Sequence, residues 1–311
     1  MILILVVTIF NFSSCGNINS DDNDGKLKIV ATLFPQYDFA RQIAGDKADV
    51  KLLLPPGVES HSFEPTPRDI IEIYNADLFL YTGDIMEPWA AAIIKGITNE
   101  NLTVVDCSEN IELLHDDEDD EDEDEDEDDG RHDHGHGADP HIWLDPNKAI
   151  KMVKDIFHAI REKDPDNYDF YLKNVNDYMN ELWKLDNDIS DVIEKAERNV
   201  IVFGGRFSYI YFLTRYNLDY VTAYDSCSTY AEPSVAKVAY VIDFIRENNI
   251  PCIYHEELSD PKVAKSIAKE TNIEYLQFST AHNITKSEFD DGVTFLDIMY
   301  ANLENLKKGL N

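Results

Sequence analysis

A long helical stretch in the middle of the chain constrains the fold more than any other feature of the sequence. Between residues 165 and 197 there is no glycine and no internal proline, and apolar side chains recur every three or four positions, as one face of a helix requires. At about 1.5 Å per residue, such a helix extends roughly 45 to 50 Å. We therefore expect residues 165–197 to form a stiff connecting helix that runs along two lobes and allows only small movements between them.

On both sides of this connector, short β-branched runs alternate with amphipathic stretches, which is typical of βα units wound around a mostly parallel sheet. The 311 residues are 43% apolar, enough for a core in each of two lobes. We expect an α/β fold with an N-terminal lobe over residues 27–164 and a C-terminal lobe over residues 198–311, each with a mostly parallel four-stranded sheet. The expected strands are 28–33, 50–54, 78–82 and 102–106, then 200–203, 220–223, 252–254 and 275–278.

Several helices are expected to begin where a capping residue is followed by proline, because proline suits the first helical position. Such junctions are loop-to-helix points, where ligand groups are commonly presented. These pairs are Thr66–Pro67, Asp145–Pro146, Glu232–Pro233 and Asp260–Pro261.

The N-terminus has the features of an export signal. Residues 1–14 carry no charge, and their apolar core over residues 2–10 is too short to span a bilayer as a helix. Small residues then precede Cys15, which resembles a bacterial lipobox whose cysteine is lipidated after cleavage. We expect a lipoprotein signal peptide over residues 1–15 and a tether over residues 16–26, which would anchor the protein at the extracytoplasmic face of the cell membrane. The alternative is a buried strand with an incidental cysteine.

The charge of the chain favours cations as partners. The formal net charge is −34, and residues 116–129 form an unbroken acidic run, so nucleic acid and anionic membrane surfaces would be repelled. The run belongs to an insert over residues 115–137 that is too polar to bury a core and is expected to be disordered. His132, His134 and His136 follow the acidic run and are predicted to gather cations weakly. The alternative is a solvated spacer with no specific task.

Three further histidines occupy segments that favour metal binding. His61 lies in a loop rich in proline and glycine, His141 stands just ahead of a helix that begins with proline, and His282 follows the last predicted strand. Such positions lie on the crevice side of an open α/β sheet. Neutral imidazole is a common ligand of borderline metals such as zinc. The alternative reading is that these are loop histidines bonded to nearby backbone.

The segments around His61 and His141, Pro-Gly-x-x-x-His-x-x-Glu-Pro-Thr-Pro and Asp-Pro-His-x-Trp-Leu-Asp-Pro, resemble two signature motifs of the metal-specific solute-binding proteins of bacterial ABC importers. This resemblance extends over nearly the whole mature chain and includes the closing helix from Thr294. It implies a monomer with two lobes that captures a divalent metal and passes it to an ABC permease. It also implies that His61 and His141 are the two ligands from the first lobe.

The second lobe departs from the family pattern. The position where the family has a His or Glu ligand is Gly204 here. The last family ligand, usually an Asp, would fall near His282 or Asn283, and we assign it to His282. A third imidazole favours zinc over manganese, which prefers a carboxylate-rich shell. The remaining ligand is left open among Cys227, Glu232, Glu256, a loop histidine and water. His255 is expected to face away, because it has the opposite parity at the end of its strand.

The function expected from these features is capture and delivery of Zn²⁺ without chemistry on the metal. A manganese-specific binding protein or adhesin of the same fold is the alternative within the family. A zinc hydrolase is an alternative from another class, which needs an open metal position and a general base. The sequence contains no His-Glu-x-x-His, Gly-x-Ser-x-Gly or phosphate-loop pattern, so we expect no enzyme.

Overall fold

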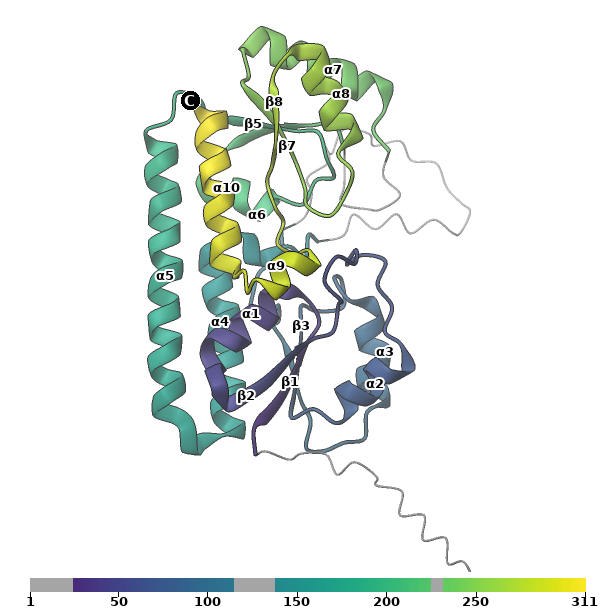
Figure 1. Cartoon of the computed structure of the whole chain (residues 1–311), viewed down its shortest axis with the longest axis vertical. Helices are drawn as coiled ribbons and strands as arrows, with labels where there is room; N and C mark the ends of the chain where they lie inside the picture. Colours follow the sequence, from purple (N-terminus) through teal and green to yellow (C-terminus); the bar gives the residue numbers. More distant parts are fainter. Residues whose placement is uncertain (1–24, 115–137, 225–231) are drawn as a thin grey trace, which may run out of the picture.

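The computed structural model describes residues 25–114, 138–224 and 232–311, and these residues form two α/β lobes stacked end to end (Figure 1). Each lobe contains a parallel four-stranded sheet, with the strand orders β2-β1-β3-β4 and β6-β5-β7-β8. The predicted fold class is therefore confirmed. The strands are β1 (Leu27–Ala31), β2 (Ala48–Leu52), β3 (Leu78–Tyr81), β4 (Thr103–Asp106), β5 (Val200–Phe203), β6 (Asp219–Thr222), β7 (Cys252–His255) and β8 (Glu274–Gln277).

The central strands are apolar on both faces, because helices cover both sides of each sheet. β3 reads Leu-Phe-Leu-Tyr and is buried throughout, and β5 reads Val-Ile-Val-Phe with one residue half-buried. The helices of the N-terminal lobe are α1 (Phe34–Ala44), α2 (Pro67–Tyr74), α3 (Pro88–Gly96) and α4 (Pro146–Lys163). Those of the C-terminal lobe are α6 (Ile210–Tyr216), α7 (Val235–Asn248), α8 (Lys262–Thr271), α9 (Lys286–Asp290) and α10 (Phe295–Leu310).

The connector is the single helix α5 (Tyr168–Glu194), preceded by a 3₁₀ turn over Pro165–Asn167. It runs along one side of the molecule past both lobes, with α10 beside it (Figure 1). Arg215 of α6 fastens the second lobe to this helix: its Nε and Nη2 donate to the two carboxylate oxygens of Asp186 at 3.0 and 2.6 Å. Tyr216 donates to the same carboxylate at 2.9 Å.

Two of the four predicted helix starts are as expected, and two are displaced. Thr66 forms a full capping box at the start of α2, and Asp145 accepts from Asn147 N at the start of α4. α7, however, begins at Val235, because the Ser234 hydroxyl caps it by accepting from Lys237 N. α8 begins at Lys262, after Pro261, and the Asp260 carboxylate forms an ion pair with Lys265 at 2.9 Å in place of a cap.

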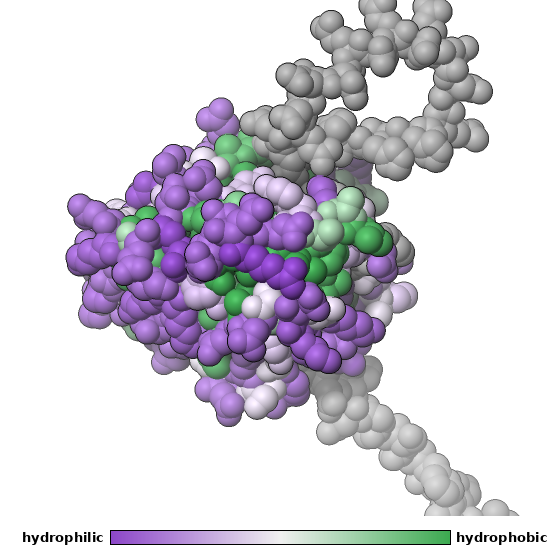
Figure 2. Space-filling view, turned by 90° about the horizontal axis from the view of Figure 1, so that it is seen from above, coloured by the Kyte–Doolittle hydropathy of each residue, from purple (hydrophilic) through white to green (hydrophobic). Residues whose placement is uncertain are grey.

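The surface over the end of the C-terminal lobe is largely hydrophilic, with smaller hydrophobic areas between the polar groups (Figure 2). Within the described ranges, no helix combines the length and the apolar character needed to cross a bilayer. The predicted signal peptide and tether, including Cys15, lie outside the described residues except for residues 25 and 26.

Candidate metal centre

Three imidazoles from both lobes meet at the seam between the sheets. His61 comes from the loop between β2 and α2, His141 immediately precedes the 3₁₀ turn Ile142–Leu144, and His282 lies in the loop after β8. Each offers one ring nitrogen, and these nitrogens all lie within 4.8 Å of one another. The ring centroids are 5.6 Å apart for His61 and His141, and 5.0 Å apart for His61 and His282.

The Nε2 atoms of His61, His141 and His282 are all buried without a hydrogen-bond partner. Leaving one buried polar atom unpaired costs about 1–3 kcal/mol, so three together require an explanation. A cation that accepts their lone pairs satisfies all three at once. Three neutral imidazole nitrogens are a donor set that suits Zn²⁺, so the residues present fit a zinc ion.

The orientation of His141 is set by Asp139. The carboxylate oxygen Oδ1 of Asp139 accepts from both His141 Nδ1 and His141 N, each at 2.7 Å. Burial raises the pKa of Asp139, but its contacts with His141 outweigh burial, so the pKa lies below its usual value. An ionised Asp139 holds the proton on Nδ1, which leaves the lone pair of Nε2 directed at the cluster.

His282 is oriented by a relay of two residues. The Thr280 hydroxyl donates to Glu257 Oε1 at 2.7 Å and is in contact with His282 Nδ1. Since its hydrogen is directed at Glu257, the hydroxyl oxygen accepts from Nδ1, and Nε2 keeps its lone pair. Ala281 between them has φ 57°, which is uncommon for a residue with a side chain. This turn places Thr280 and His282 so that both point to the same side.

The loops that carry His61 and His282 are bonded directly to each other across the seam. Asn283 Nδ2 donates to the carbonyl oxygens of Pro55 and Val58 at 2.7 and 3.0 Å, and Gly57 N donates to Ile284 O at 2.7 Å. Gly57 has φ +85°, a conformation that favours glycine. The proline-glycine loop therefore holds His61 against the second lobe.

His61 and His282 are held in the neutral form that metal binding requires. Burial, followed by the nearby His141, lowers the pKa of His61 to about 4. Burial also lowers the pKa of His282 well below its usual value, and the neighbouring imidazoles add to this effect. Both rings are therefore neutral at pH 7.

The predicted ligand Glu256 lines the same cavity, but it is not part of the histidine cluster. Its carboxylate accepts from Arg206 N at 3.1 Å, from Arg206 Nε at 3.3 Å and from Ser259 Oγ at 2.7 Å. Its assignment as a ligand stays a prediction. His255 faces away, as expected: its Nδ1 contacts Glu256 O, and its ring lies 5.9 Å from that of Tyr275.

Other predicted site residues are separate from the cluster or lie beyond the described part of the chain. Glu232 is exposed and does not belong to the cluster. Cys227 and the accessory histidines His132, His134 and His136 lie outside the described residues.

Gly204 has no room for a side chain. A Cβ atom there would lie 2.7 Å from Ile253 Cδ1 of β7 and 2.9 Å from Ala264 Cα of α8. Because the second contact is with backbone, it cannot be relieved by rotating a side chain. The residues packed around Gly204 therefore leave no space for a ligand side chain at this position.

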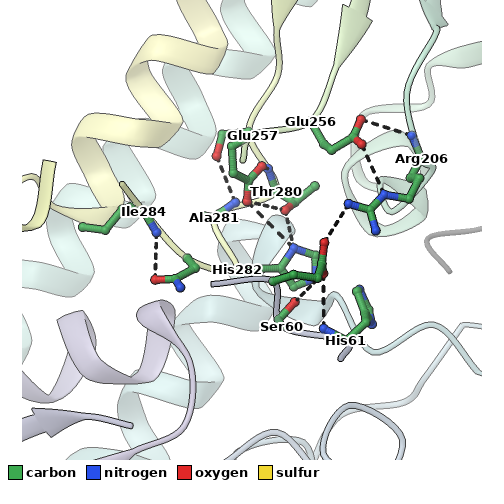
Figure 3. A network of polar contacts seen from close by, with 12 residues as sticks. Ser60, His61, Arg206, Glu256, Glu257, Thr280, Ala281, His282 and Ile284 are labelled. Carbon is green, nitrogen blue, oxygen red and sulfur yellow. Dashed lines mark hydrogen bonds and ion pairs between the residues drawn. The ribbon is translucent and has the colours of Figure 1, made fainter. Parts of the chain in front are cut away.

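Glu59 and Arg206 also belong to this cavity, although we did not predict them from the sequence. Arg206 Nη2 of the C-terminal lobe donates to Glu59 Oε2 of the N-terminal lobe at 2.7 Å, and Glu59 Oε1 accepts from His61 N at 3.2 Å. In Figure 3, Arg206 reaches toward His61 and His282 from the side of Glu256. The sequence offered one signal for them: Glu59 lies two residues before His61, and Arg206 lies two residues after Gly204.

Comparisons with known proteins agree on one family. The family model described as "Zinc-uptake complex component A periplasmic" matches residues 29–309. The chain is 37% identical over 302 residues to the high-affinity zinc uptake system protein ZnuA of Bacillus subtilis (strain 168), which covers 96% of this chain and 93% of that protein.

Two further similarities concern Streptococcus pneumoniae. The chain is 31% identical over 291 residues to its zinc-binding lipoprotein AdcA (strain ATCC BAA-255 / R6), covering 93% of this chain and 57% of that protein. The crystal structure of the Zn(II)-bound ZnuA-like domain of AdcA is similar with a TM-score of 0.75 at 28% identity, covering 92% of this chain and 99% of that domain.

Proposed function

Because the chain belongs to the family described as zinc-uptake complex component A, we propose that it captures Zn²⁺ outside the cytoplasm and delivers it to the permease of an ABC-type importer. His61, His141 and His282 are the proposed ligands, and water takes the fourth position. The observation that carries the proposal is the convergence of three buried, unpaired Nε2 atoms at the seam of the two lobes.

The donor set favours zinc over manganese as the cargo. Imidazole nitrogen suits zinc, whereas manganese prefers carboxylate and water oxygens. The two glutamates near the cluster, Glu59 and Glu256, are both bonded to Arg206. The names of the relatives, which refer to zinc uptake and zinc binding, support the same choice.

A zinc hydrolase also has three protein ligands and an open position, but it needs a general base for the bound water. Glu59 and Glu256 line the cavity, yet the guanidinium of Arg206 engages both carboxylates and makes them poor bases. The chain also belongs to a family described as a component of a zinc-uptake complex, which supports the same conclusion. We therefore propose a binding protein rather than an enzyme.

The N-terminal segments fit a protein held at the outer face of the cell membrane. We propose that residues 1–15 form the lipoprotein signal, that cleavage occurs just before Cys15, that Cys15 then carries the lipid, and that residues 16–26 tether a monomeric binding protein to the membrane. The relative AdcA is named a lipoprotein. Radiolabelled fatty acid should be incorporated into the wild-type chain, and a Cys15→Ala variant that still incorporates it would contradict this assignment.

The insert is proposed to have a separate, weaker role. His132, His134 and His136, beside the acidic run, would gather cations for the tight site, while His61, His141 and His282 hold the transported ion. Zinc titration of the metal-free chain in competition with a chromogenic chelator tests this division. Deleting residues 115–137 should leave one tight zinc per chain and remove the weaker sites. Loss of the tight site on deletion would contradict the proposal.

A further inference from the structure

Arg206 links two cavity carboxylates that belong to different lobes. Its Nη2 donates to Glu59 at 2.7 Å, and its Nε and backbone N donate to Glu256 at 3.3 and 3.1 Å. The three side chains are largely shielded from water, with exposed fractions of 17% for Arg206, 11% for Glu256 and 32% for Glu59. Charge pairs in such surroundings are screened less than surface pairs, and Arg206 therefore engages both carboxylates firmly.

The backbone before Arg206 is shaped to admit this arrangement. A Cβ atom on Gly205 would lie 1.8 Å from Glu256 Oε2, so any side chain there would displace the carboxylate. Ser259 Oγ holds the other oxygen, Oε1, at 2.7 Å. Glu256 is thus fixed beside the guanidinium by a glycine on one side and a hydroxyl on the other.

Without Arg206, both carboxylates would be available to a cation in the cavity. Glu59 lies two residues before His61, and Glu59 and Glu256 line the cavity together with His61 and His282. Removing the guanidinium would leave the carboxylate oxygens of both glutamates without this donor. Two such oxygens beside three imidazoles would form a harder, mixed shell, which suits manganese better than three nitrogens do.

We propose that Arg206 is a specificity-determining residue, which withholds Glu59 and Glu256 from the metal and so keeps the site selective for zinc over manganese. This inference rests on the proposed function, because it concerns the same site and its cargo. The charge of Arg206 also opposes a bare cation in the cavity, and Zn²⁺, with stronger bonds to imidazole, overcomes this opposition more readily than Mn²⁺.

The test measures the dissociation constants of Zn²⁺ and Mn²⁺, each added alone to the metal-free full chain, for four proteins. These are the wild type, Arg206→Met, Arg206→Lys, and Arg206→Met combined with Glu59→Gln and Glu256→Gln. Methionine removes the charge and the hydrogen bonds while keeping much of the side-chain volume. The triple variant lacks Arg206 and also lacks the carboxylates that it would release.

Arg206→Met should tighten Mn²⁺ binding relative to Zn²⁺ binding by about tenfold or more. The triple variant should return the ratio to within about threefold of the wild type. Arg206→Lys should move the ratio in the same direction but less, because an ammonium group cannot span both carboxylates as the guanidinium fork does; it also serves as the test if Arg206→Met does not fold.

An unchanged ratio in the folded Arg206→Met protein would overturn the inference, as would a shift that persists in the triple variant. If Arg206→Met does not fold, an unchanged ratio in Arg206→Lys would overturn it. The wild-type measurement separates this inference from the proposed function. A wild type without tight zinc binding contradicts the proposed function, whereas tight zinc binding with an unchanged ratio contradicts only the role of Arg206.

Discussion

The imidazole rings of His141 and His282 lie 4.5 Å apart, centroid to centroid, with their planes at 89°. One ring belongs to the N-terminal lobe and the other to the C-terminal lobe, and the buried Trp143 joins the two segments by donating from Nε1 to Thr280 O at 2.7 Å. The two rings are therefore in place before a metal arrives. A preorganised site lowers the free-energy cost of ordering the ligands on binding.

Small lobe movements should accompany zinc binding. The helix α5 runs past both lobes without a break, and the loops that carry His61 and His282 are already bonded to each other by Asn283. We expect the radius of gyration from small-angle X-ray scattering to change by less than about 1 Å between metal-free and zinc-loaded protein. A chain without residues 115–137 serves as the control, so that the insert does not contribute. A large compaction in that control would contradict the prediction.

Replacing Asp139 with asparagine should weaken zinc binding although Asp139 is not a proposed ligand. The carboxylate fixes the Nδ1 proton of His141, and an amide would fix the ring less well and without charge. Loss of such a partner typically costs about 10- to 100-fold in metal affinity. The exposed Asp166→Asn is the matched control for competitive zinc titration. Equal affinities of the two variants would show that Asp139 does not act through His141.

A side chain at Gly204 should destabilise the metal-free protein. Gly204→Ala would press Cβ against Ile253 and the backbone of Ala264, and overpacking of this kind typically costs about 1–3 kcal/mol in the free energy of unfolding. Gly96→Ala, where nothing lies within 4 Å of the added atom, is the control for chemical denaturation. For the same steric reason, Gly204→His should not tighten zinc binding, although histidine supplies a possible ligand. A histidine variant with wild-type stability and tighter zinc binding would contradict this account of the missing ligand.

The buried Glu87 should make the protein less stable as the pH rises. Burial raises its pKa to about 8, against the hydrogen bonds from Thr32 and Thr82 and together with the charge of Asp106. Between the unfolded value near 4.5 and the folded value near 8, the native state binds more protons than the unfolded state, so stability falls as pH increases. Each unit of this difference corresponds to about 1.4 kcal/mol.

Glu87→Gln should remove this pH dependence. The free energies of unfolding of wild type and variant should differ least near pH 5. Between pH 5 and pH 8, the free energy of unfolding of the variant should rise relative to that of the wild type by about 2–4 kcal/mol. Urea denaturation of the metal-free protein at the two pH values gives both numbers. A constant difference across this range would mean that Glu87 does not titrate as its burial indicates.

Much of the architecture could be predicted because it depends on local patterns. The β-branched runs gave the strands to within two residues at either end, and the apolar repeat gave α5. The start of α7 was misplaced because Glu232–Pro233 resembles a capped start, while the hydroxyl of Ser234 is the group that accepts the bond.

Only those residues of the candidate site that stand in an informative local segment could be predicted from the sequence. His61 and His141 stand in recognisable motifs and His282 follows the last predicted strand, and the structure brings the ring nitrogens of all three together. The Arg206–Glu59 pair joins residues 147 positions apart, and no local pattern indicates a pair at that distance. The crowding at Gly204 depends on how β7 and α8 pack against it, which is also a tertiary property.

The central claim is that imidazoles from both lobes hold one zinc ion, and the zinc dissociation constants of single histidine variants test it most directly. His61→Ala, His141→Ala and His282→Ala should each weaken binding by at least about a hundredfold, while the exposed His158→Ala should bind as the wild type does. If His282→Ala retains wild-type affinity, His282 is not a ligand and the account is contradicted.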